Sequence, residues 1–339
     1  MTIRSETAPT SDITIRLDDR IRLISALLAA TDYPDQVQQR RPHGTHAHVR
    51  ATRKALGGLR QHPLAVLTQA MLDKGVKLEA LFTASQLLDA DTFEAQHPLP
   101  AWLPPHWDEH LQAFANAAGL LDWWAQETAA WDKSLAEVRR MFADINYGPT
   151  LAPYFGESGD RLVVVPNISY PSEREVGLKV AGEMIAVVPP PLAWGDSPPW
   201  PYDEETMLMP TVRASLGAYA RLHVAAMLRA HPDRVAEAAE NALPVNDQFR
   251  EQHPTWEEQF AELFVTAIIA MFLEAHAGQA EYKSFVLMER KMRGMNILPG
   301  TVSVLRRYLQ ERGNKYESFV DFLPLFPKQL RVAKRMVNL

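Results

Sequence analysis

The sequence predicts an α+β protein that is predominantly helical. Apolar residues recur at spacings of three and four through both ends of the chain, which is typical of helices that bury one face. Two short runs rich in β-branched residues lie near the middle, over residues 162–165 and 179–188, and these predict a small sheet. We therefore expect a helical N-terminal half, a small sheet and a helical C-terminal half.

The composition is that of an ordinary globular protein. Its 339 residues, 47% of them apolar and 22% charged, suggest two domains or one large domain. The net charge of -6 and the lack of a basic stripe argue against a nucleic-acid partner. The chain contains no cysteine, which excludes disulfides, thiolate catalysis and cysteine-based zinc sites.

Residues 1–12 are polar and are predicted to be disordered. The stretch from Met1 to Asp19 lacks the apolar core of a signal peptide, so none is expected. No run approaches 18 uncharged apolar residues, and we expect no membrane span. The expected location is the cytoplasm.

Residues 13–147 are predicted to form a helical N-terminal region. A first helix follows Asp18 and Asp19, and two more are expected before a Pro-rich connector over residues 97–106. Residues 107–146 are expected to form two helices or one kinked helix, with their tryptophans packed in the core.

Residues 148–339 are predicted to hold a small sheet over 160–190 and helices over 203–337. Pro189–Pro191 ends the sheet, and a Pro/Trp-rich loop follows to about Tyr202. The expected helices lie near 207–230, 232–242, 254–277, 281–293, 299–312 and 325–337.

Two of these helices carry residues that suit a functional site. The helix over 256–273 is apolar on all sides yet contains Glu262, which must be paired, coordinated to a metal or protonated. On the helix over 211–230, His223 lies one turn after Tyr219 on an apolar face. Each residue is either a satisfied core group or a ligand.

The order of these features resembles the gluzincin class of zinc metallopeptidases, in a bacterial branch defined as a domain of unknown function. The similar features span residues 15–330 and begin with the helix opened by Asp18 and with His62-Pro63. They continue with a sheet before the motif helix, Trp256 six residues before Glu262, and a Tyr-rich end. The resemblance implies a zincin-like core in which the small sheet packs on the motif helix.

Gluzincins carry the motif HExxH on one helix and a third zinc ligand, a glutamate, on a later helix. Here the motif position reads Tyr219-Ala220-Arg221-Leu222-His223, and Glu262 matches the third ligand. Tyr219 thus replaces the first histidine, and Ala220 replaces the glutamate that activates water. The resemblance therefore implies a vestigial site formed by Tyr219, Ala220, His223 and Glu262, with no catalytic residue. No metal is expected, and any zinc that did bind would use His223 and Glu262.

The function expected from this resemblance is that of an inactive peptidase-like protein, a pseudoenzyme, that binds a peptide or protein in the remnant cleft. The segment 179–188 would serve as a sheet edge for the peptide, and the loop 189–202 could cap the cleft. Two alternatives stay open. The chain is an active hydrolase with a non-standard zinc site, or it is a structural scaffold in which His223 and Glu262 pair. The sequence leaves the substrate, the pathway and the oligomeric state open.

The remaining histidines are predicted to be structural. His43, His46 and His48 do not have a zinc-binding spacing and are expected on a solvated surface. His231, His253 and His276 are expected at helix ends. Phosphate-binding, dinucleotide-binding and serine-elbow motifs do not occur.

Overall fold

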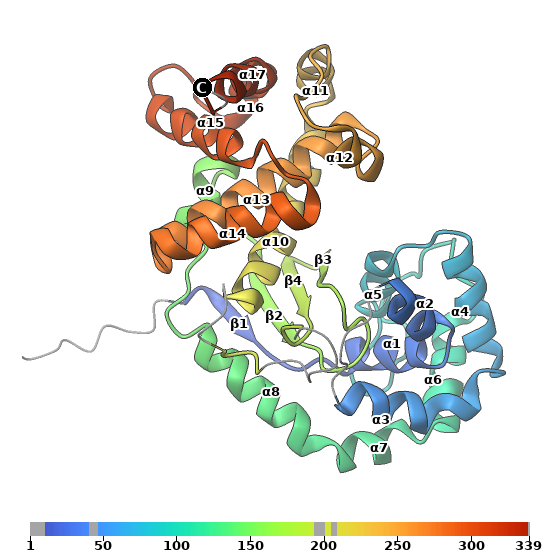
Figure 1. The fold of residues 1–339 in the computed structure, drawn as a ribbon. Helices are drawn as coiled ribbons and strands as arrows, with labels where there is room; N and C mark the ends of the chain where they lie inside the picture. The colour runs from blue at the N-terminus through green and yellow to red at the C-terminus, as the bar shows by residue number, and fades with distance from the viewer. Residues whose placement is uncertain (1–10, 41–46, 193–200, 205–208, 338–339) are drawn as a thin grey trace, which may run out of the picture. The chain divides into compact units, whose positions relative to one another are not determined.

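The computed structural model describes residues 11–40, 47–192, 201–204 and 209–337. Helices dominate these residues and a four-stranded mixed sheet accompanies them, which confirms the α+β, mainly helical class (Figure 1). The chain divides into two compact units. The sheet unit comprises Met1–Ile145, Asp160–Glu204 and Pro210–Ser215, and the helical unit comprises Asn146–Gly159, Glu205–Met209 and Leu216–Leu339.

Most elements of the sheet unit precede its main strands. They are β1 (Ile13–Ile15), α1 (Asp19–Ala29), α2 (Tyr33–Arg40), α3 (Ala47–Leu56), the 3-10 helix η1 (Gly57–Leu59), α4 (Pro63–Asp73), α5 (Leu78–Ser85), α6 (Trp107–Ala117), α7 (Leu120–Gln126), α8 (Thr128–Met141), β2 (Arg161–Pro166), β3 (Val176–Val180) and β4 (Glu183–Val188).

The helical unit is built from α9 and the C-terminal helices. Its elements are α9 (Gly148–Phe155), most of α10 (Pro210–Ala230), α11 (Pro232–Ala239), α12 (Asp247–Gln252), α13 (Trp256–His276), α14 (Gln279–Arg293), α15 (Leu298–Glu311), α16 (Phe319–Phe322), the 3-10 helix η2 (Leu323–Leu325) and α17 (Phe326–Val337). The long C-terminal helices lie near their predicted positions, whereas β1, α2, α3, α9, α12 and α16 had no predicted counterpart.

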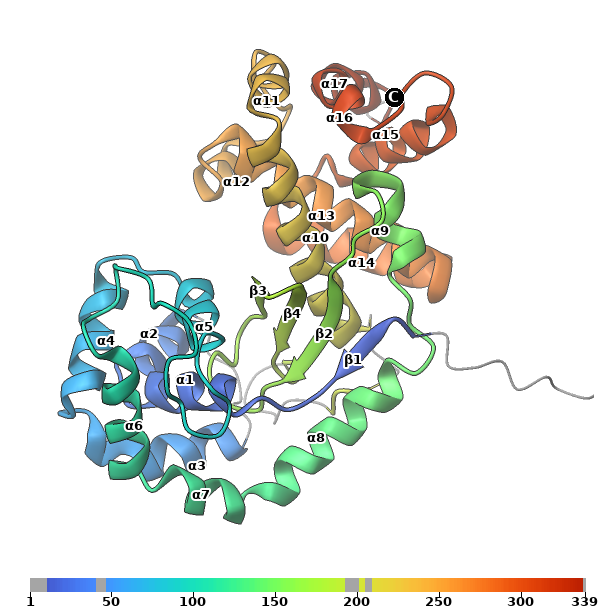
Figure 2. The same ribbon diagram turned by 180° about the vertical axis from the view of Figure 1, so that it is seen from behind.

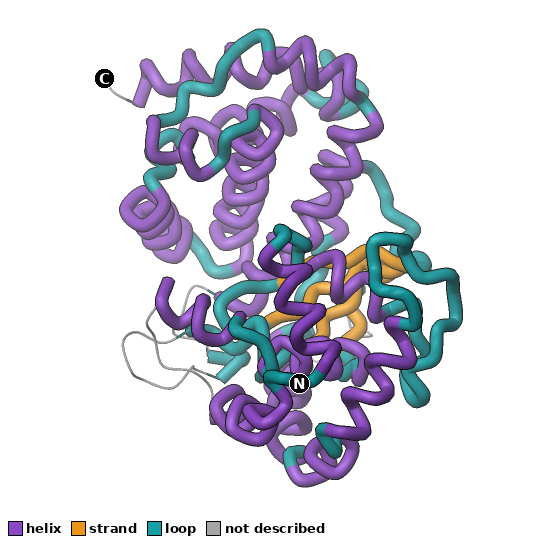
Figure 3. Tube along the Cα trace, turned by 90° about the vertical axis from the view of Figure 1, so that its right-hand side faces the viewer, coloured by secondary structure: helices purple, strands orange, loops and turns teal. Residues whose placement is uncertain are grey.

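The sheet has the strand order β1-β2-β4-β3. β1, β2 and β4 are parallel, and β3 runs antiparallel to β4. Helix α8 lies along β1 and β2, as the view from behind also shows (Figure 2). The small strand layer stands out among the helices of the same unit in Figure 3.

One face of the sheet joins the core of the N-terminal helices. Alternate strand residues point to opposite faces, so β2, β3 and β4 each contribute every second side chain to this core. The contributing residues are Val163, Val165, Val176, Leu178, Ile185 and Val187, and they pack with apolar residues of α1 and α3–α7. Both faces of β2 and β4 are buried, which explains why their sequences are continuously apolar.

The prediction of one strand over 179–188 is wrong. The chain turns at Ala181 and Gly182, whose φ angles of 49° and 75° belong to the left-handed region. Two consecutive residues with positive φ are typical of a two-residue hairpin. The hairpin places β4 inside the sheet between β2 and β3, so the edge strands are β1 and β3.

The prediction for residues 107–146 understated the number of helices. Three helices fill this stretch, because Gly119 adopts a left-handed φ of 57° and α7 ends at Gln126, just before α8 begins. Three tryptophans of this stretch are core residues as predicted, with Trp107, Trp124 and Trp131 at most 6% exposed, and Trp123 is partly buried against the same core.

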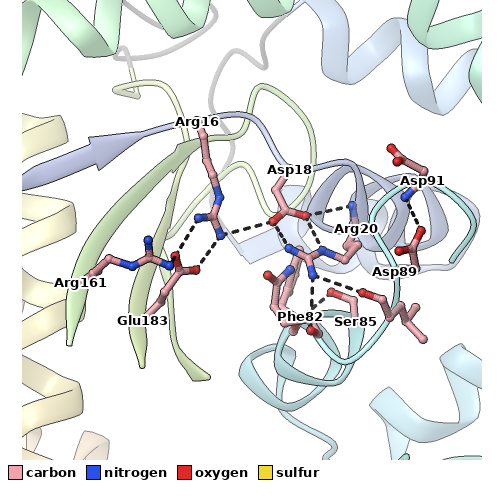
Figure 4. A network of polar contacts seen from close by, with 11 residues as sticks. Arg16, Asp18, Arg20, Phe82, Ser85, Asp89, Asp91, Arg161 and Glu183 are labelled. Atoms are coloured by element: carbon pink, nitrogen blue, oxygen red, sulfur yellow. Dashed lines mark hydrogen bonds and ion pairs between the residues drawn. The ribbon is translucent and has the colours of Figure 1, made fainter. Parts of the chain in front are cut away.

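A polar network ties the start of α1 to β4 (Figure 4). Arg16 donates to both carboxylate oxygens of Glu183 at 2.9 and 2.8 Å and lies 3.7 Å from Asp18. Asp18 caps α1 and accepts from the Arg20 guanidinium at 2.7 Å, while Arg161 adds an ion pair with Glu183. The hydrogen bond from Arg16 lowers the pKa of Glu183. The network therefore fixes where the first helix leaves the sheet.

The core of the helical unit is aromatic. Tyr154 of α9 packs edge-on against Phe264 with ring centroids 5.2 Å apart and stacks on Tyr308 at 5.7 Å. Phe319 lies 5.0 Å from Tyr308 and 4.9 Å from Phe264. The Tyr308 hydroxyl donates to the Pro153 carbonyl at 3.0 Å, which holds α9 in place.

Among the described residues, α13 is the one helix long and apolar enough to cross a membrane by length and composition. Its most apolar window is 67% buried inside the protein. Phe260, Leu263 and Phe264 are fully buried within it. This burial is that of a core helix.

The expected division into residues 13–147 and 148–339 differs from the two units. The sheet belongs with the N-terminal helices, since its strands bury their side chains against α1 and α3–α7. Residues 148–159 belong with the C-terminal helices, as in the expected division, and residues 146 and 147 join them. A division by sequence order cannot detect that the later segment 160–204 returns to the N-terminal unit.

Candidate functional site

Helix α10 carries three of the four residues assigned to the vestigial site. Pro210 opens the helix, where its missing N–H costs no helical hydrogen bond. Tyr219 and Ala220 are fully buried, and His223 is half-buried. Because they are four residues apart, Tyr219 and His223 lie on one face of the helix.

Helix α9 and the residue before it cover that face. The Tyr147 ring lies edge-on to Tyr219 with centroids 5.8 Å apart. At the other end of α9, the Phe155 ring stacks on His223 with centroids 4.8 Å apart and an interplanar angle of 13°. The face that would present zinc ligands is therefore packed with aromatic rings.

Glu262 is paired with arginines. It lies on α13, is 8% exposed, and accepts a hydrogen bond from Arg293 of α14. Arg221 of α10 lies 3.6 Å from the same carboxylate oxygen. Burial alone would raise the pKa of Glu262, but Arg221 and Arg293 outweigh it and lower the pKa to about 2. Glu262 is therefore a carboxylate at neutral pH.

Helix α13, which carries Glu262, packs on one side of α10, and His223 lies on another side of α10. A methyl group added at Gly217 would lie 3.2 Å from Arg221 Nη1 and 3.4 Å from Ile269 Cδ1. Helix α13 thus packs on the face of α10 that carries Gly217 and Arg221. Arg221 precedes His223 by two residues, which is a rotation of about 200° around the helix. The two expected metal ligands are not brought together.

The residues assigned to the site do not fit a catalytic zinc ion, which takes three protein ligands and a water. Tyr219 packs under Tyr147, Glu262 is engaged by two arginines, and Ala220 offers no carboxylate. Glu258 instead closes a capping box with Thr255 at the start of α13. Over the described ranges, no group of three His, Asp or Glu side chains is placed to hold a metal.

A cavity of about 770 Å³ lies beside His223 within the helical unit. Its walls come from the end of α9, the second half of α10, the start of α11 and the loop between α15 and α16. The lining residues are Pro153, Tyr154, Phe155, Gly156, His223, Ala226, Met227, Ala230, His231, Arg234, Arg312, Glu317, Ser318, Phe319, Val320 and Asp321. Glu262 does not line it, so among the residues predicted for the site His223 alone lines the cavity, beside an aromatic wall.

The solvated surface predicted for the histidine cluster is wrong for His48. Its side chain is buried against Trp131 and Trp123, and Nδ1 lies 2.5 Å from a Glu127 carboxylate oxygen. Burial lowers the pKa of His48, although Glu127 opposes this shift. His43 and His46 lie outside the described residues, as does the part of the Pro/Trp loop over 193–200.

The other histidines occupy helix ends, as predicted. His231 lies between α10 and α11, His253 ends α12, and His276 is the last residue of α13. Of the three, His231 lines the cavity.

Sequence reasoning missed the partners of the site. Arg293 lies 31 residues after Glu262, and nothing in the local pattern pairs them. Phe155 lies far from His223 in the sequence. Tyr154 and Phe155 stand between a proline and a glycine, and such a short aromatic pair is a weak signal of a packed turn. Comparison with known protein families, with curated proteins and with solved structures finds no match for this chain.

Proposed function

We propose that this chain is a non-catalytic binding protein with a zincin-like scaffold, and that it holds a peptide segment in the cavity beside His223. The cytoplasm as location, and a peptide or protein as partner, belong to the same proposal. The observation that carries it is the cavity of about 770 Å³, whose wall includes His223 while the other residues assigned to the site are packed or paired.

The chemistry of the site supports binding without hydrolysis. Hydrolysis by a gluzincin requires a bound metal and a carboxylate that takes a proton from water. Ala220 stands where that carboxylate is expected, and the Glu262 carboxylate is engaged by Arg293 and Arg221. What remains beside His223 is a cavity with apolar and charged residues in its lining and no water-activating carboxylate at position 220.

The cavity is a better candidate for the peptide than the sheet edge expected from the sequence. β4 has a partner strand on both sides and cannot accept another. Of the two edge strands, β3 has five residues with α5 lying against it, and β1 has three residues. By contrast, the cavity has the size of a small-ligand pocket, and Phe155 and Met227 in its wall can contact an apolar side chain.

Filling the cavity tests the proposal. Ala226→Trp places an indole among its lining residues, and Ala236→Trp puts the same group on the exposed side of α11. We expect fluorescent peptides with apolar residues to bind the unaltered protein and the Ala236 variant alike. Binding to the Ala226 variant should fall at least about tenfold, because the indole displaces the peptide. Equal binding by both variants, or no peptide binding at all, would overturn the proposal.

Metal content separates this proposal from an active hydrolase. We expect the purified, untagged protein to retain well below one zinc ion per chain after dialysis against zinc and then against buffer. His223 and Glu262 face different sides of α10, and two ligands hold zinc weakly. Stoichiometric zinc that survives dialysis, together with cleavage of a peptide pool, would favour the hydrolase.

A further inference from the structure

The lining of the cavity beside His223 contains several charged side chains, and two of them, Arg312 and Glu317, differ from the others in their ion pairing. Arg234 pairs with Glu237 at 2.9 Å and approaches Asp321, whose carboxylate also accepts from Ser318. Arg312 and Glu317 are exposed, and within the described part of the chain neither side chain forms an ion pair. One positive and one negative group are thus left for a ligand.

A tight turn between α15 and α16 holds both groups at the cavity. Residues 312 and 316 form a β-bridge, and the Gly313 N–H donates to the Tyr316 carbonyl at 2.8 Å. Gly313 has a φ of 81°, which favours glycine at this point of the turn. Tyr316 is anchored on Phe322 with ring centroids 5.1 Å apart. Arg312 and Glu317 flank this turn and reach the same cavity.

The rest of the lining supplies apolar contact. Phe155 is held by stacking on His223 and stays partly exposed, whereas Phe319 is fully buried against Tyr154 and Tyr308 and supports the wall from behind. Met227, one turn after His223, adds a flexible apolar side chain. A ligand that matches the whole lining therefore combines an apolar body with one anionic and one cationic group.

We propose that the cavity takes a short peptide with both termini free. Its carboxylate would pair with Arg312, its ammonium group with Glu317, and its apolar side chains would lie against Phe155 and Met227. This inference rests on the proposed peptide-binding function and names the class of peptide. Planar guanidinium groups suit carboxylates, and an exposed carboxylate suits an ammonium group.

The test uses the tripeptide Leu-Phe-Leu in four forms, namely free, N-acetylated, C-amidated and capped at both ends. Binding to the full-length protein is measured by calorimetry. We expect the free form to bind most tightly and each cap to weaken binding by about fivefold, the effect of one exposed ion pair.

Two variants assign the termini to their partners. In Arg312→Gln, amidation of the peptide should no longer weaken binding, while acetylation should still weaken it. In Glu317→Gln, acetylation should no longer weaken binding, while amidation should still weaken it. Lys328→Gln and Glu251→Gln remove exposed charges outside the lining and should leave all four affinities unchanged.

The outcomes separate the two proposals. Peptides that bind equally well with and without caps, or cap penalties that persist unchanged in both variants, would overturn the inference and leave peptide binding intact. Failure of all four forms, and of longer apolar peptides, to bind would overturn the proposed function and the inference with it.

Discussion

At the scale of single residues, Glu262 is a buried carboxylate whose partners lie on two other helices. A carboxylate on a helix that is apolar on all sides must be paired, coordinated or protonated. In the structure the Glu262 carboxylate is paired, because Arg293 donates a hydrogen bond to it and Arg221 lies 3.6 Å from it. Because both arginines are partly exposed, water solvates the far side of each guanidinium while the carboxylate stays buried.

Glu262→Gln should therefore destabilise the protein in a pH-dependent way. The pKa of Glu262 lies near 2 in the folded state, so its stabilisation is present above the unfolded value and is lost as pH falls toward 2. We expect a loss of about 2–3 kcal/mol at pH 7, and of about half that at pH 3.

Urea unfolding of both proteins at the two pH values measures this difference. Glu251→Gln, at an exposed position of α12, is the matched control and should change stability by less than about 0.5 kcal/mol. A pH-independent loss for Glu262→Gln would contradict the ion-pair explanation.

At the scale of elements, the turn between β3 and β4 decides the sheet order. Ala181 and Gly182 both have positive φ, which suits the twist of a two-residue hairpin. The turn folds β3 back onto β4 and leaves β4 between two strands. A peptide therefore cannot join the sheet at β4.

Gly182→Ala should lower the free energy of unfolding by about 1–2 kcal/mol, because residues with a Cβ are disfavoured at a φ of 75°. A Cβ at this position would meet no atom within 4 Å, so the cost comes from the backbone alone. Gly159→Ala, which is equally open and has no positive φ, should be nearly neutral in the same thermal unfolding assay. Equal effects of the two substitutions would argue against this turn.

At the scale of the whole molecule, the helical unit is assembled from separated parts of the chain. Residues 146–159 join helices that begin at residue 216, while the intervening strands belong to the sheet unit. Tyr154 fixes this assembly, since its ring contacts Phe264, Tyr308 and Phe319. Without α9, both the aromatic core and the wall of the cavity would be incomplete.

Tyr154→Ala in the full chain should lower the free energy of unfolding by about 3–5 kcal/mol, as for other large aromatic residues removed from cores. Tyr154→Phe should cost less than about 1 kcal/mol, because the hydroxyl contacts the Met271 sulfur at 3.9 Å and the ring is kept. Denaturant unfolding followed by circular dichroism compares the two. A small effect of Tyr154→Ala would mean that α9 is not needed for the helical unit.

The helices were predictable because their signals are local. Asp18 caps α1 and apolar residues mark its buried face, so both ends of the helix are legible in the sequence. β1 was missed because its three residues are too few to show an alternating pattern. The strand expected over 179–188 was wrong because Gly182 resembles a residue inside a strand until its φ is known.

The sequence by itself determined the class of the fold and the main helices, since both depend on residue types and short spacings. Tertiary structure alone decided that Glu262 pairs with Arg293, that α9 covers Tyr219 and His223, and that Arg312 and Glu317 meet at one cavity. These contacts join helices that are distant in the sequence. Their geometry depends on which faces pack, and local periodicity does not specify the partner of a face.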